Sequence, residues 1–132
     1  MDAVPTSVVR GRDGAYYVGQ LTGFPFPVGG ANVYRVVPGE EPEVYATGFT
    51  NIIDLGFGPD GRLYVLEMFH NGLLSGDPTG ALLKVRRGGS VEEVMTTGLV
   101  TPGGLTFDRH AAYVSNCGTC AGSGSVLRIP LD

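Results

Sequence analysis

Apolar and polar residues alternate in short runs along most of this chain. Ile53, Leu55 and Phe57 alternate with other residues, a Pro-Asp-Gly turn follows, and an apolar run from Leu63 to Leu66 comes next. An Asp-Gly pair between two such runs is typical of a β-hairpin. No stretch keeps the helical period of about 3.6 residues together with capping residues. The pattern therefore predicts an all-β protein.

The same pattern occurs three times along the chain. Each repeat holds a turn followed by a strand with a central tyrosine, and 47 residues lead from Tyr17 to Tyr64 and 49 from Tyr64 to Tyr113. A further strand follows at a similar spacing in each repeat. A period of about 45–50 residues built from short strands is typical of β-propeller blades.

We predict a single half-propeller domain over residues 1–132, with blade 1 at about 5–49, blade 2 at about 50–99 and blade 3 at about 100–132. The first two blades each contain four predicted strands, whereas the last blade lacks its outer strand.

Three blades form an open fan with an apolar face exposed at each end, which monomers seldom tolerate. The simplest closure is a two-fold homodimer in which blade 3 of each copy packs on blade 1 of the other. The chain would then be half of a six-bladed β-propeller. The other interpretation is that the chain is a fragment of a longer protein.

Four stretches carry a resemblance to one family, namely Val4 to Val8, Tyr17 to Pro27, Gly48 to Asp54 and Asp60 to Glu67. They resemble the ScyD/ScyE family, exported bacterial six-bladed propellers related to NHL-type repeats and named for proteins encoded with scytonemin pigment synthesis. The resemblance implies that the chain corresponds to the last three blades of a parent that is exported to the periplasm or the extracellular space.

Three features depart from this family. Arg12 stands where the family tends to have proline, and the hairpin turn at His110 is one residue shorter than the turn of blade 2. The N-terminal strand with which the family commonly completes its last blade is also missing. The resemblance supports the fold far more than any activity.

Charge and composition exclude several classes of partner. The formal net charge is −4 and Lys84 is the only lysine, so we expect no nucleic-acid partner. No apolar run approaches the roughly 20 residues that span a bilayer, so we expect no membrane insertion. The segment from Met1 to Pro5 has no basic flank and no apolar run, so we expect no signal peptide in this chain.

The long loops between the second and third strands of each blade are expected to gather at one end of the propeller, where binding sites usually lie. Gln20, Glu67 and Asn116 occupy equivalent positions at the start of these loops, and Asp54 is the only charged residue at the start of an inner strand. Oxygen ligands of this kind suit a cation or a small polar ligand. The alternative is that they satisfy loop backbone amides.

Three further residues carry candidate chemistry. His70 is a candidate ligand or general base, or else a solvated or packed side chain. Cys117 and Cys120 form a small disulfide if the protein is exported and remain thiols otherwise. A structural zinc site would need ligands from another chain, because this chain has no second Cys-x-x-Cys and no paired histidines.

No nucleophile elbow, P-loop, His-Glu-x-x-His or Ser/His/Asp grouping is visible. We therefore expect a non-catalytic binding or assembly module that associates with itself, without a cofactor. The alternative is a metal-dependent hydrolase of the lactonase kind, with a cation such as Ca²⁺ held at the channel mouth by Asp54 and Glu67, helped by Asn51 or Asn116.

Overall fold

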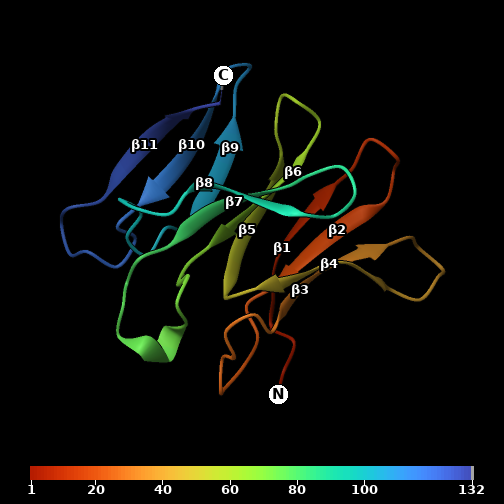
Figure 1. The fold of residues 1–132 in the computed structure, drawn as a ribbon, viewed down its shortest axis with the longest axis horizontal. Helices are drawn as coiled ribbons and strands as arrows, with labels where there is room; N and C mark the ends of the chain where they lie inside the picture. The colour runs from red at the N-terminus through yellow and green to blue at the C-terminus, as the bar shows by residue number, and fades with distance from the viewer. Residues whose placement is uncertain (132) are drawn as a thin grey trace.

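The computed structural model describes residues 1–131 and consists of three antiparallel sheets (Figure 1). The first sheet contains β1 (Pro5–Arg10), β2 (Tyr16–Gln20), β3 (Ala31–Val36) and β4 (Glu43–Phe49). The second contains β5 (Ile52–Phe57), β6 (Leu63–Glu67), β7 (Ala81–Val85) and β8 (Val91–Met95). The third contains β9 (Gly104–Phe107), β10 (Ala111–Asn116) and β11 (Ser125–Pro130).

The prediction of an all-β fold built from blades is confirmed, including a third sheet that lacks its outer strand in the described chain. The strands of each sheet follow chain order, so every neighbouring pair is joined by a hairpin connection. A single 3₁₀ turn, η1 (Leu73–Ser75), interrupts the loop after β6. Among the described residues, no helix is long and apolar enough to cross a membrane.

The turn between the first and second strands of each sheet contains the same hydrogen bond. An aspartate carboxylate accepts a bond from the hydroxyl of a tyrosine on the following strand and also caps a backbone N–H group within the turn. The three pairs are Tyr17 to Asp13 at 2.8 Å, Tyr64 to Asp60 at 3.1 Å and Tyr113 to Asp108 at 2.6 Å. The repeat that the spacing of the tyrosines predicts is therefore also a repeat of polar contacts.

The core lies between the sheets. One cluster of buried side chains joins the first sheet to the second and includes Tyr17, Leu55 and Val65. A second cluster joins the second sheet to the third and includes Tyr64 and Val114. We call the side of a sheet that is turned toward the preceding sheet its upstream face, and the opposite side its downstream face.

Among residues 1–131, no sheet covers the upstream face of the first sheet. Val8, Val18, Tyr34 and Val44 form one row across its four strands through direct cross-strand pairing. Val8 is 63% exposed and Val44 is 53% exposed, so this apolar row is open to solvent. At the other end of the fan, the downstream face of the third sheet is open, and its Val126 is 70% exposed.

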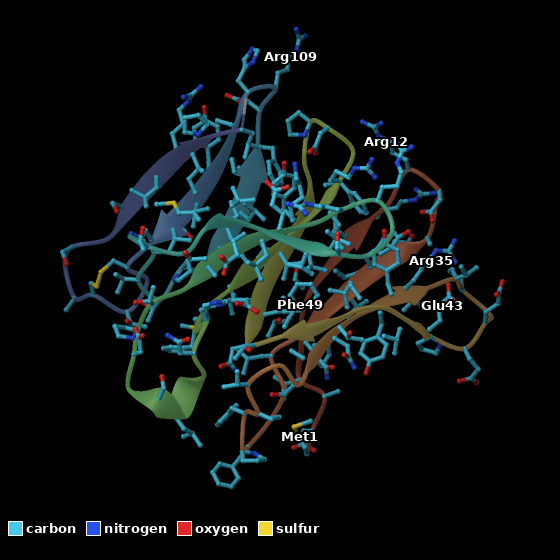
Figure 2. The ribbon with its side chains drawn as sticks, in the orientation of Figure 1. Met1, Arg12, Arg35, Glu43, Phe49 and Arg109 are labelled. Atoms are coloured by element: carbon cyan, nitrogen blue, oxygen red, sulfur yellow. A yellow bond between two sulfur atoms is a disulfide. The ribbon has the colours of Figure 1, made fainter. Side chains whose placement is uncertain are left out.

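The two ends of the sheets differ, as Figures 1 and 2 show. The turns that hold Arg12 and Arg109 lie at one end, and Met1 lies at the other with the β2–β3 loop (Figure 2). At this second end, the segment before each inner strand bonds to the loop after the second strand, as in the 2.9 Å bond from Met68 N to Asn51 O. The long loops therefore share one end of the molecule, which we call the loop end.

Candidate functional site

The candidate site lies at the loop end, where each blade places a polar side chain at the end of its second strand. Gln20 and Asn116 both use their amides to hold backbone. Gln20 donates to Ala3 O at 3.1 Å and accepts from Asn32 N at 2.9 Å. Asn116 accepts from Val100 N at 2.7 Å and donates to Gly98 O at 3.1 Å. Each amide thus fixes the segment that leads into the inner strand of its own blade.

Glu67 occupies the equivalent position in the second blade and is the most enclosed of the three. Its side chain is 2% exposed, and its Oε2 accepts a bond of 2.6 Å from Thr50 N. Its Oε1 pairs with Nδ1 of His70, whose side chain is 33% exposed. The two predicted residues Glu67 and His70 are therefore brought together as a pair, with the carboxylate inside and the imidazole at the surface.

Burial raises the pKa of the Glu67 carboxyl group, because a low-polarity environment disfavours the charged form. The hydrogen bond from His70 and the bond from the Thr50 backbone act in the opposite direction and favour the charge. Because Nδ1 of His70 faces Glu67, Nε2 is the nitrogen left for a ligand or a proton. The pair can hold an imidazole in one orientation, which is the arrangement that a proton-transfer or ligand-binding histidine needs.

A cleft of about 710 Å³ opens beside this pair. Thr50 lines it from the connection between β4 and β5, and Glu93 lines it from β8. Arg86 and Glu92 also line it and form an ion pair of 3.1 Å. The Glu67–His70 pair is therefore accessible to a small polar molecule.

Asp54 lies elsewhere, among the inner strands. Its Oδ1 accepts from the Ser7 hydroxyl at 2.6 Å and from Leu55 N at 2.8 Å. Its Oδ2 accepts from Leu105 N at 2.8 Å. Both oxygens of this carboxylate therefore bond to the protein, and they link the inner strands of all three blades.

Asp54 and Glu67 take part in separate hydrogen-bond networks with no common partner in the part of the chain that the structure describes. Among residues 1–131, no group of three or more histidine, cysteine, aspartate or glutamate side chains is arranged to hold a metal ion. The four predicted residues Gln20, Glu67, Asn116 and Asp54 thus share one kind of contact, namely bonds to backbone N–H or C=O groups, which is the alternative that the sequence left open.

Cys117 and Cys120 are joined as a disulfide in the loop after β10, visible at the left of Figure 2. This loop also contacts the segment before the third inner strand, where the hydroxyl groups of Thr101 and Thr119 lie 2.9 Å apart. His110 lies in a turn at the end of the molecule opposite to the loop end.

Sequence reasoning missed the part that Thr50 plays in the site. Its backbone N–H bonds to Glu67, and its hydroxyl accepts a bond of 2.9 Å from Gly29 N in the β2–β3 loop. The neighbouring Asn51 is 1% exposed and joins two loops, because it donates to Leu21 O at 3.0 Å and accepts from Leu73 N at 2.9 Å. Both residues lie in the Gly48 to Asp54 stretch, one of the four that carry the family resemblance. That resemblance is the sequence signal that could have pointed to them.

Comparison with known proteins supports the fold. No protein-family model matches this chain, and no curated protein matches it. The chain is similar to a streptogramin B lyase structure with a TM-score of 0.58 and 17% identity, over 96% of this chain and 41% of that one. It is also similar to a protein provisionally named a gluconolactonase, with a TM-score of 0.60 and 19% identity, over 96% of this chain and 48% of that one.

At these identities the similarity establishes the fold alone. The chain spans less than half the length of either neighbour. The narrower resemblance to the ScyD/ScyE family has no counterpart among these matches and stays a prediction. What the topology and the two neighbours together establish is that this chain has the fold of a partial β-propeller.

Proposed function

We propose that this chain is a non-catalytic assembly and binding module of the ScyD/ScyE kind, which pairs with a second copy to complete a six-bladed propeller. In the completed ring, blade 3 of each copy packs on blade 1 of the other. The ring presents its loop end, with one Glu67–His70 cleft from each copy, to a small polar ligand. Export of the protein is part of this proposal and agrees with the disulfide between Cys117 and Cys120.

One observation carries this proposal: the two open faces are equivalents of faces that are packed inside the chain. On the open upstream face, Val8 and Val18 pair as Leu55 and Val65 do in the second sheet, where these two side chains are buried against the first sheet. On the open downstream face, Tyr113 stands where Tyr64 contacts the following sheet. Each copy therefore offers both halves of an interface that it already forms twice.

The open upstream face has the chemistry of an interior surface. A hollow of about 250 Å³ on this face is lined by Val18, Tyr34, Val36 and Pro42. Contiguous exposed apolar surface of this kind usually marks an interface. Rotation by one blade-to-blade step would place the downstream face of another blade against it, and a two-fold arrangement of two such copies closes without leaving a free end.

The proposal is tested by the mass of the protein in solution, measured by light scattering over a range of concentrations. A dimer of about 28 kDa, twice 13.8 kDa, is expected. Val8→Glu places a charge in the proposed interface and should shift the protein toward monomer. Leu74→Glu is the matched control, because Leu74 is similarly exposed at 61% but lies within η1 at the loop end. A monomeric wild-type protein, or equal effects of both variants, would overturn the proposal.

Ligand binding by the Glu67–His70 pair within its cleft is the part of this proposal that does not depend on the ring, and it is tested separately. The observation that favours it is a carboxylate with a 2% exposed side chain beside a 33% exposed imidazole. NMR titration of the protein with a panel of small polar molecules, followed at the His70 imidazole, tests this binding. The His70→Gln variant should lose it. The lactonase-like alternative is less favoured, since the Asp54 oxygens that it needs already bond to Ser7, Leu55 and Leu105.

A further inference from the structure

We call the interface between two neighbouring blades a joint. We infer that the joint between two copies is the weakest in the six-bladed ring, because Gly104 offers no acceptor to the backbone N–H group of Val8 in the second copy. This inference rests on the proposed closure and states where the closed ring opens. The joint is defined by comparison with the two joints that the chain forms within itself.

Both internal joints contain the same tie between inner strands. At the first, Ser7 Oγ on β1 accepts a bond of 3.2 Å from Leu55 N on β5. At the second, Asp54 Oδ2 on β5 accepts a bond of 2.8 Å from Leu105 N on β9. In each case a side chain near the start of one inner strand accepts from the backbone of the next inner strand, one position further along.

The next tie in this series would run from Gly104 to Val8 of the second copy. Gly104 pairs with Ser115 as Ser7 pairs with Gly19, and Val8 stands at the position of Leu55 and Leu105. A glycine has no side-chain acceptor. Within residues 1–131, no side chain accepts a bond from the Val8 N–H group. The tie is therefore absent at the joint between copies.

A contact between two aromatic side chains also repeats at the internal joints. The Tyr17 and Phe57 rings lie 5.2 Å apart at an angle of 77°, and the Tyr64 and Phe107 rings lie 5.0 Å apart at 55°. Each tyrosine is on a downstream face, and each phenylalanine ends the inner strand of the next sheet. Aromatic pairs in such tilted or edge-on arrangements add to the energy of burial.

At the joint between copies this contact changes as well. Tyr113 supplies the tyrosine, but Arg10 of the second copy stands where Phe57 and Phe107 stand, at the last position of its inner strand. The Tyr113 hydroxyl already accepts a bond of 3.3 Å from Arg128 Nε and donates one of 2.6 Å to Asp108.

Arg10 would therefore meet a tyrosine that already has a cationic neighbour. Arg109 adds a second cation on the same turn, and Asp108 is the one anion in contact with the tyrosine hydroxyl among the described residues. An attraction between the guanidinium group and the ring would be offset by repulsion between like charges. The copy-to-copy joint thus keeps the apolar surface of an internal joint and loses the two specific contacts that both internal joints share. The ring should open there and exchange subunits while each half stays folded.

The test restores the missing tie. In Gly104→Asp, the new Cβ would lie 3.2 Å from Ser115 Oγ, and Gly104 is outside the left-handed region, so an aspartate fits with a small movement of that hydroxyl. A bond to a carboxylate should strengthen each joint about tenfold or more. Because the ring has two such joints, the dimer dissociation constant should fall about a hundredfold, and exchange between labelled and unlabelled copies should slow. Gly103→Asp, where the Cβ also has room, is the control for added charge.

Arg10→Phe is the second variant and restores the aromatic contact at an exposed position of β1. It should also tighten the dimer, independently of Gly104→Asp. If the wild-type protein dimerises and neither variant binds more tightly than Gly103→Asp, the weak-joint inference is wrong while the proposed ring stands. If the wild type is a monomer at every concentration, the ring itself is refuted, and the weak-joint inference falls with it.

Discussion

The hydroxyl of Ser7 on β1 donates a hydrogen bond of 2.6 Å to Asp54 Oδ1 on β5, 47 positions later in the chain. The other oxygen of the same carboxylate holds Leu105 N on β9. A single side chain therefore connects the inner strands of all three blades. Sheets that pack only through apolar faces could slide along one another, whereas these directional bonds fix their relative position.

Replacing this carboxylate should loosen the joints on both sides of the second blade. Asp54→Ala should lower the free energy of unfolding by about 2–3 kcal/mol, because it leaves Leu105 N and the Ser7 hydroxyl without their acceptor and takes from Leu55 N the shorter of its two bonds. Urea denaturation measures the change. Asp2→Ala is the control, since Asp2 is exposed and its carboxylate accepts no hydrogen bond among the described residues. Equal stability of the two variants would contradict a linking role for Asp54.

The tyrosine–aspartate bond in the hairpin turns makes a second prediction. Tyr64 is 2% exposed, and its hydroxyl donates to Asp60 Oδ2, which also contacts Lys84 Nζ at 3.2 Å. Tyr64→Phe removes this bond and leaves the packing against Phe107 in place, so it should cost about 1 kcal/mol of stability. Thermal unfolding measures the loss. Tyr16→Phe is the matched control, because the hydroxyl of the exposed Tyr16 makes no hydrogen bond within residues 1–131. Removing that hydroxyl should leave the midpoint of thermal unfolding unchanged.

The fold could be predicted from the sequence because each blade repeats the same local signals. Alternation sets which side chains face each joint, and the Asp-Gly turns set the hairpins, so the order of strands in all three sheets follows from patterns a few residues long. The equivalence of Ser7, Asp54 and Gly104 was also visible from the spacing. The same spacing could not show that Asp54 bonds across two joints, because that contact depends on how closely the packed sheets approach.

The site could be predicted only as a set of positions. Glu67 and His70 stand three residues apart outside any helix, so no periodic rule brings them together. Their contact depends on the loop after β6, which is held by the bond from His70 N to Thr79 O and by Asn51. Such loop conformations follow from tertiary contacts rather than from local preference.

The buried Glu67 makes stability depend on pH in a defined direction. Burial raises its pKa above the ordinary value of 4.5 for a glutamate, so between these two values the folded protein binds more protons than the unfolded chain. The stability of the wild type should therefore fall relative to Glu67→Gln as the pH rises from below 4.5 through the raised pKa. The amide oxygen of the glutamine variant can still accept from Thr50 N. Urea denaturation at a series of pH values measures the difference between the two proteins.

The partner of Glu67 supplies the control for this pH dependence. His70 lowers the pKa of Glu67, so His70→Gln should extend the pH range over which stability is lost toward higher pH. A constant stability difference between the wild type and Glu67→Gln across the whole range would show that the carboxyl group has the same pKa in the folded and unfolded chains. Burial of the Glu67 carboxylate would then cost no free energy.

Val4, immediately before β1, adopts a left-handed backbone conformation that a β-branched residue rarely accepts. Its φ is +50°, and the equivalent positions before the other inner strands are also left-handed, with φ of +46° at Asn51 and +38° at Thr101. The architecture therefore demands this conformation at every blade, and asparagine tolerates it better than valine. Val4→Asn should raise the free energy of unfolding by about 1 kcal/mol, because the side chain is 38% exposed and loses little burial. Val28→Asn makes the same exchange at an exposed loop position outside the left-handed region and should give no gain. Chemical denaturation of both variants measures the two changes in stability. If Val28→Asn stabilises the protein as much as Val4→Asn does, the gain comes from replacing an exposed apolar side chain with a polar one. It would then not come from relief of backbone strain.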